Sequence, residues 1–184
     1  MSRIPRLQRQ ALNEQQRELY EQITGGPRAA GPQLFALTDR DGGLRGPFNA
    51  LLLSPEVGGA LQAVGIALRY RSTLSARLRE LAILAVAAHW DSAFEWHAHE
   101  RIARSVGIAQ PELDAVRIGD AASLPPIDAI ALRLVREMMS GDVGDDEYAE
   151  AVAVLGEKVI FELSTIVGYY GTLALQLKLF RVSV

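Results

Sequence analysis

Hydrophobic positions recur at helical spacing along most of the chain. After Ser54-Pro55, apolar residues lie three and four positions apart, as on one face of an amphipathic helix. Residues 78–86 are apolar nearly all round, which indicates a helix surrounded by other helices. The predicted helices span about 14–24, 55–70, 75–88, 92–106, 111–118, 126–140, 145–155 and 157–180. No strand-like alternation of useful length occurs, so the sequence predicts an all-α, compact helical bundle.

Residues typical of helix ends lie at the borders of these stretches. Asn13 and Ser75 are predicted N-caps, and Gly107 is predicted to end a helix. A loop is expected through residues 31–32, followed by a turn at residues 39–43. No clear repeat or linker divides the chain, so we expect a single domain over residues 1–184.

The composition excludes several classes of chemistry. The 184 residues include no cysteine, which rules out disulfides, thiolate metal sites and a cysteine nucleophile. The net charge of −3 lacks the basic surplus of a sequence-independent nucleic-acid binder. The apolar stretch 163–177 is shorter than the roughly 20 residues of a spanning helix, and no secretory signal is evident. We expect a cytoplasmic protein that binds neither nucleic acid nor membrane.

The histidines suggest a candidate site, because all three lie between residues 89 and 99. Glu95 and His99 are four residues apart, on one face of a helix. His97 points to nearly the opposite side, which disfavours a helical metal pair, so no metal is expected. A carboxylate one turn from an imidazole orients the ring and favours its protonated form, which makes a proton shuttle near neutral pH. His89 and His97 flank the two tryptophans and are expected to be packing or surface residues.

Other charged residues extend this site. Glu80 belongs to the preceding apolar helix, and it would approach Glu95 and His99 if the two helices pack antiparallel. Neighbouring carboxylates raise one another's proton affinity, as an acid catalyst requires. Arg69 and Arg71 are candidates for binding a substrate carboxylate, although arginines on a turn are commonly only solvated.

The same residues also fit purely structural roles. Ser92 and Glu95 have the spacing of a capping box, in which Glu95 only closes the start of a helix. His99 fits a hydrogen-bonded core histidine. Glu80 fits an ion pair with Arg77 or Arg101.

The segment LSARLRELAILAVAAHWDSAFEWHAHERIARSVGI resembles the carboxymuconolactone decarboxylase family, whose superfamily also contains the alkylhydroperoxidase D-type thiol reductases. The core resemblance covers about residues 48–118. The flanking pieces GPFNALLLSPEVGGAL and ELSTIVGYYGTLALQLKLF resemble a longer subfamily of decarboxylase-like proteins. This resemblance implies an N-terminal arm, a C-terminal helical extension and an all-α fold.

The redox branch of this superfamily carries the pattern E-x11-C-x2-C-x3-H. Counted from Glu80, the two cysteine positions hold Ser92 and Glu95, and His99 falls on the histidine position. The resemblance thus implies that the acid and the histidine of the proton relay are retained while both sulfurs are replaced. Thiol peroxidase activity is therefore not expected.

The resemblance implies a cofactor-free lyase that removes carbon dioxide from a small carboxylated lactone and protonates the resulting dienolate. Glu80, Glu95 and His99 would be catalytic, and Arg69 or Arg71 would bind the substrate. It also implies a homo-oligomer with sites near subunit contacts. Three alternatives stay open: another acid–base enzyme such as an isomerase or hydrolase, a non-catalytic oligomeric binding protein, and a metal-dependent enzyme.

Overall fold

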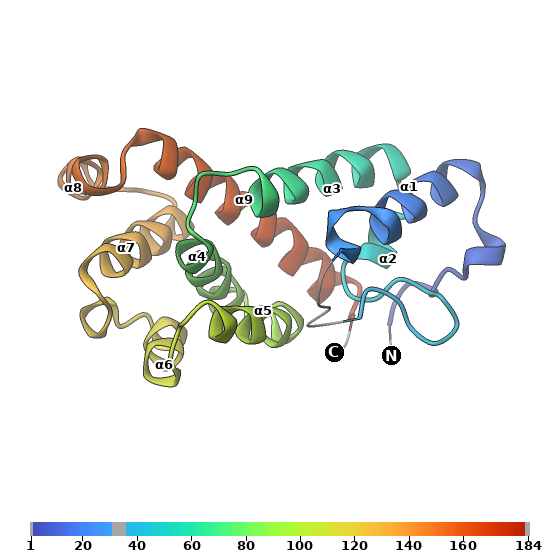
Figure 1. Ribbon diagram of the computed structural model, residues 1–184, viewed down its shortest axis with the longest axis horizontal. Coiled ribbons are helices and arrows are strands. Elements are labelled where there is room, and N and C mark those ends of the chain that lie inside the picture. Colours follow the sequence, from blue (N-terminus) through green and yellow to red (C-terminus); the bar gives the residue numbers. More distant parts are fainter. Residues whose placement is uncertain (1, 31–35, 183–184) are drawn as a thin grey trace. The chain divides into compact units, whose positions relative to one another are not determined.

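The computed structural model describes residues 2–30 and 36–182 (Figure 1). The expected loop at residues 31–32 lies outside this part of the chain. The described residues form helices and no strand, and one isolated bridge pairs Thr38 with Leu44. The all-α prediction is therefore confirmed. The chain divides into two compact units, residues 1–71 with 175–184 and residues 72–174, and the single domain stays a prediction.

The first unit contains α1 (Glu14–Gly25), the short α2 (Phe48–Leu51) and α3 (Pro55–Tyr70). Asn13 caps α1 as predicted, because its Oδ1 accepts a 2.9 Å hydrogen bond from the Gln16 amide and the Gln16 side chain accepts one from the Asn13 amide. Buried residues from α1 and α2 share one apolar cluster that includes Leu19, Ile23 and Phe48. The unit therefore has a core of its own.

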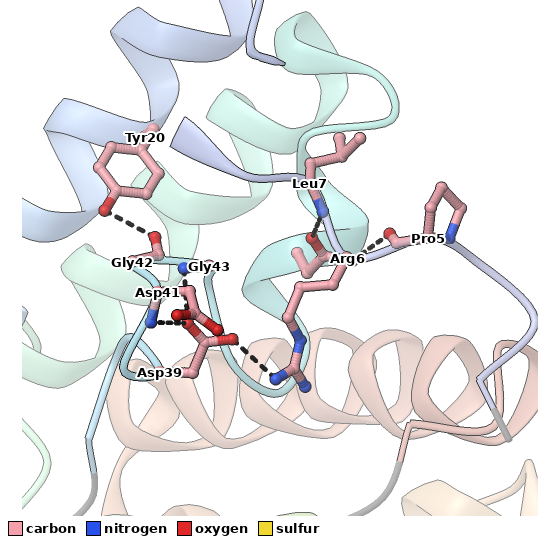
Figure 2. A network of polar contacts seen from close by, with 9 residues as sticks. Pro5, Arg6, Leu7, Tyr20, Asp39, Asp41, Gly42 and Gly43 are labelled. Atoms are coloured by element: carbon pink, nitrogen blue, oxygen red, sulfur yellow. Dashed lines mark hydrogen bonds and ion pairs between the residues drawn. The ribbon is translucent and has the colours of Figure 1, made fainter. Parts of the chain in front are cut away.

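A polar turn of the first unit is organised by one carboxylate, as Figure 2 shows. Asp39 accepts hydrogen bonds from the amides two and four residues later, at 3.0 and 2.8 Å, and from Arg6 at 2.8 Å. Burial raises the pKa of Asp39, but the bonds from Gly43, Arg6 and Asp41 together bring the pKa below its usual value. Tyr20 ties the turn to α1 by donating to the Gly42 carbonyl at 2.8 Å. The predicted turn is thus confirmed.

The second unit is built around α4 (Ala76–His89) (Figure 1). This helix packs against α5 (Ala93–Ser105), α6 (Gln110–Ile118) and α7 (Pro126–Ser140). Every residue from 80 to 87 is buried, as the apolar sequence predicts. Ser75 caps α4 by accepting a 3.1 Å hydrogen bond from the Leu78 amide. The remaining helices are α8 (Asp145–Leu155) and α9 (Glu157–Leu179), whose last five residues belong to the first unit.

Arg77, in the first turn of α4, connects three parts of this unit. Its Nε donates to Asp128 of α7 at 2.7 Å, one terminal nitrogen donates to the Gly107 carbonyl at 2.9 Å, and the other pairs with Glu112 of α6. Hydrogen bonds from the Ala109 amide and from Arg77 lower the pKa of Glu112. Gly107 itself has φ +89°, as expected of a residue that ends a helix. We call Arg77, Glu112 and Asp128 the arginine clamp.

Among the helices described, none combines the length and apolar character needed to cross a membrane.

Candidate active site

Glu80 is a fully buried carboxylate in the second turn of α4. Apolar neighbours on the same helix exclude water from it, so its charge depends on partners within the protein. Arg79 supplies one of them, with its Nε 3.3 Å from Glu80 Oε1. The other carboxylate oxygen, Oε2, lies 2.6 Å from Nδ1 of His99 on α5. The approach of Glu80 to His99, which the sequence made conditional on how the two helices pack, therefore occurs.

His99 lies between two carboxylates. While Nδ1 faces Glu80, its Nε2 lies 3.5 Å from Oε2 of Glu95, one turn earlier on α5. Both glutamates and the histidine are at most 3% exposed. We call Glu80, Glu95 and His99 the buried triad.

The two distances imply different roles for the two ring nitrogens. The short contact to Glu80, itself beside the Arg79 guanidinium, is that of a charge-assisted hydrogen bond in which Nδ1–H donates to a carboxylate. The 3.5 Å separation between Nε2 and Glu95 exceeds the roughly 2.7–3.2 Å of an N–H···O bond. A neutral imidazole with its proton on Nδ1 leaves Nε2 as an acceptor. Nε2 therefore faces the Glu95 carboxyl group at a distance longer than an ordinary hydrogen bond.

Two residues that the sequence reasoning left out of the site contact it. Tyr170 of α9 meets the His99 ring edge-to-face, with ring centroids 5.2 Å apart and an interplanar angle of 90°. Tyr170 is 3% exposed, and its partner is set by the packing of its helix. Arg79 adjoins Glu80 in sequence. A cationic residue next to a carboxylate on a buried helix was the sign by which Arg79 could have been assigned to the site. The sequence predicted the three titrating groups of the site, whereas Tyr170 follows only from the packing of α9.

Residues 55–137 match the model of the carboxymuconolactone decarboxylase family. Over this range the chain is similar to that family. The matched range includes the whole buried triad, and the absence of cysteine from the chain agrees with a branch that lacks the paired cysteines.

A solved structure confirms that the fold is shared with the alkylhydroperoxidase D group. It is described as an alkylhydroperoxidase AhpD core, an uncharacterized peroxidase-related protein from Ralstonia eutropha JMP134. The likeness has a TM-score of 0.75 at 19% sequence identity and covers 99% of this chain and 91% of that one. The comparison with curated proteins finds no match.

The structure contradicts two of the structural roles that the sequence left open for this segment. Ser92 makes no capping hydrogen bond at the start of α5, so the predicted capping box is wrong and Glu95 instead turns toward His99. Arg77 does not pair with Glu80, because it is engaged in the arginine clamp. His89 and His97 are exposed, as expected of surface residues.

The two arginines predicted to bind substrate lie outside the unit that holds the triad. Arg69 is in the last turn of α3, with its guanidinium 5.9 Å from the centroid of the Tyr70 ring, and Arg71 follows the helix. Both belong to the first unit of the chain. Their anion-binding role stays a prediction.

Metal binding finds no support in the geometry. Within residues 2–30 and 36–182, no group of three or more His, Asp or Glu side chains is arranged to hold a metal ion. The triad instead offers what proton transfer needs: a ring fixed at one nitrogen and a carboxylate facing the other.

Proposed function

We propose that this protein is a cofactor-free, acid–base lyase of the carboxymuconolactone decarboxylase type. Its substrate would be a small lactone that bears a carboxylate. The observation that carries the proposal is the placement of His99, with Nδ1 bonded to Glu80 and Nε2 facing Glu95. The family assignment of residues 55–137 supports the same class of reaction.

The reaction would use the triad as the acid. The bond between the carboxylate carbon and the ring breaks, carbon dioxide leaves, and the electron pair remains in the conjugated lactone as a dienolate. A proton held between Nε2 of His99 and Glu95 is then added to carbon, and solvent returns a proton to the pair. Glu80 keeps Nδ1 protonated throughout, so that Nε2 is the nitrogen that gains and loses the proton.

The burial of the triad favours a second candidate, a non-catalytic oligomeric binding protein on the same scaffold. His99 is 3% exposed, locked to Glu80 at 2.6 Å and covered by the Tyr170 ring. A histidine whose ring is fixed in this way also serves as a core hydrogen-bonding residue. Activity measurements distinguish the two candidates.

The decisive experiment measures carbon dioxide released from a panel of carboxylated lactones. The wild type is compared with His99→Gln and Glu95→Gln, and exposed His89→Gln is the matched control. General acid catalysis predicts a loss of about 10²–10⁴-fold in turnover for the two triad variants and none for the control. Equal turnover in His99→Gln excludes this mechanism. A folded wild type that releases no carbon dioxide from any lactone supports the binding protein.

Arg69 and Arg71 are tested separately. If either holds the substrate carboxylate, Arg69→Gln or Arg71→Gln should raise KM about tenfold with little change in kcat. An unchanged KM in both variants removes them from the substrate site.

We also infer that the chain self-associates, as the resemblance to the family implies. Phe161 of α9 and Ile118 of α6 are 71% and 74% exposed, and a contact between subunits would remove such apolar side chains from water. Light scattering of the purified protein should give a multiple of 20.0 kDa, and Phe161→Asp should lower it. A monomeric wild type contradicts this inference.

A further inference from the structure

The connection between α4 and α5 forms one side of a cavity that the triad does not line. Its volume is about 290 Å³. Its walls come from the end of α4, from Asp91 and Ser92, from the first two turns of α5, and from Arg117 of α6. We call this cavity the Ser92 pocket.

The start of α5 is polar and uncapped at this pocket. Ser92 occupies the N-cap position, yet its side chain makes no capping bond. Ser92 is only 9% exposed, and within the described chain its hydroxyl has no hydrogen-bond partner. A buried hydroxyl without a partner is costly, and the first turn of a helix presents amide groups that lack acceptors within the helix. Both features favour an anionic acceptor at this point.

Trp96 and Arg117 form another side of the pocket. The Arg117 guanidinium lies 4.0 Å from the centroid of the indole ring, a close cation–π contact. The ring is held in turn by Glu100, whose Oε2 accepts from Trp96 Nε1 at 3.1 Å. The second oxygen of Glu100 accepts from Arg104 at 2.7 Å, so this carboxylate is already occupied. A planar cation on a fixed aromatic ring is therefore available to a ligand.

The backbone at the pocket is held in an uncommon conformation. Asp91 has φ +48°, one of two non-glycine residues with positive φ in the described chain. The next amide, that of Ser92, donates to the Ala87 carbonyl at 2.8 Å and so fixes the serine against the end of α4. The exposed Asp91 side chain places one negative charge at the rim. An anion binds in this pocket despite that negative charge, so removing the charge should tighten anion binding.

We propose that the Ser92 pocket binds a small carboxylate with an apolar ring, such as an aromatic monocarboxylate. The carboxylate accepts from the Ser92 hydroxyl and from the Ala93 amide, and Arg117 supplies the positive charge. Ala87 and Ala88 leave room for the ring, which lies against the Trp96 side of the pocket. This combination of an apolar wall with a few placed donors is typical of small-molecule sites. The proposal does not depend on the lyase reaction.

Binding of benzoate to the purified full chain tests the proposal, measured by calorimetry and by amide NMR. Benzamide, which has the same shape without the charge, is the control ligand. We expect one benzoate per chain, with shifts centred on Ser92 and Ala93, and at least about tenfold weaker binding of benzamide. Equal affinities for the two ligands, or shifts centred elsewhere, overturn the proposal.

Three variants and one matched control locate the site. Ser92→Asp should abolish benzoate binding and raise Tm, because its own carboxylate would cap α5 and occupy the anion position. Arg117→Gln should weaken binding about tenfold. Asp91→Asn keeps a residue that tolerates positive φ and removes the opposing charge, so binding should tighten a few-fold.

Arg133→Gln is the control, because it removes an exposed arginine of α7 that pairs with Glu150. It should leave benzoate binding unchanged. If Ser92→Asp is folded and still binds benzoate like the wild type, the pocket is not the site. All these readouts are of binding, so they are independent of whether any lactone is decarboxylated.

Discussion

Arg77 and Glu80 lie one turn apart on α4, yet they build different kinds of charged cluster. The arginine clamp is partly exposed, and a permanent cation serves two carboxylates and a carbonyl. The buried triad has the opposite composition, because two carboxylates share one imidazole whose charge depends on a proton. Guanidinium keeps its charge at every accessible pH, whereas imidazole changes charge near neutrality.

This difference separates a structural cluster from a chemical one. Burial lowers the pKa of Arg77, but its hydrogen bonds to Glu112 and Asp128 outweigh this and raise the pKa. Arg77 therefore keeps its positive charge at all working pH values. The triad, by contrast, holds its imidazole between two carboxylates, which under the proposed function would exchange a proton with it.

The largest effect is expected from breaking the clamp. Arg77→Met should lower the free energy of unfolding by about 2–3 kcal/mol, because it leaves the buried Asp128 without its cation; partial exposure keeps the value below that of a fully buried pair. Urea unfolding at pH 7 measures the change. Arg133→Gln, which breaks an exposed pair with Glu150, should cost less than about 0.5 kcal/mol. Equal losses in both variants would remove the distinction between the clamp and a surface pair.

A smaller loss is expected from the triad. Glu80→Gln removes the buried charge itself and keeps an oxygen that accepts from Nδ1. No carboxylate is left without a cation, as it is in Arg77→Met, so the free energy of unfolding should fall by about 1–2 kcal/mol. Calorimetric melting of this variant beside Arg77→Met gives the comparison directly. A Glu80→Gln protein less stable than Arg77→Met would mean that the triad, not the clamp, is the main structural cluster of α4.

The aromatic contact should contribute less again. Tyr170→Leu removes the edge-to-face contact with His99 while keeping an apolar residue, which should cost about 0.5–1.5 kcal/mol. If the ring also orients His99, the histidine NMR signals should shift in this variant. Unchanged signals for His99 would show that Glu80 alone fixes the imidazole.

The smallest expected effect is a change in how the free energy of unfolding depends on acidic pH. The folded-state pKa of Glu112 is lowered from 4.5 by the Ala109 amide and Arg77, so its contribution to stability is present above that value and is lost as the pH falls through the lower folded-state pKa. Arg77→Met removes one of the two causes. Urea unfolding between about pH 5 and pH 3 should therefore show a shallower loss of stability in the variant than in the wild type. If stability falls with pH equally steeply in the variant and the wild type, the acid sensitivity arises from other carboxylates.

Local patterns in the sequence predict much of this second unit. The uniformly apolar run of α4 predicted its burial, and the four-residue spacing of Glu95 and His99 placed both on one face of α5. The approach of Glu80 to His99 was expected only on the condition that the two helices pack antiparallel, and the contact is present. These features depend on neighbours in sequence or on one turn of helix, which periodicity reports well.

The errors have a different origin. Ser92 and Glu95 match a capping box, but the competing partner, His99, decides where Glu95 points. The contact of Tyr170 with His99 joins residues 71 positions apart through the packing of α9, which no local pattern encodes. The four-residue α2 was missed because it is too short to show a period.

The connection from His89 to Ala93 has a consequence for changes in chain length. Only three residues separate α4 from α5, and amides at Trp90, Asp91 and Ser92 are all bonded back to α4 carbonyls. One inserted residue carried into α5 would turn the helix by about 100° and move His99 away from Glu80. We expect insertions here to be far more damaging than insertions in the turn at residues 39–43. The pairing of Glu80 with His99 is thus set by a residue count in a link that supplies neither side chain.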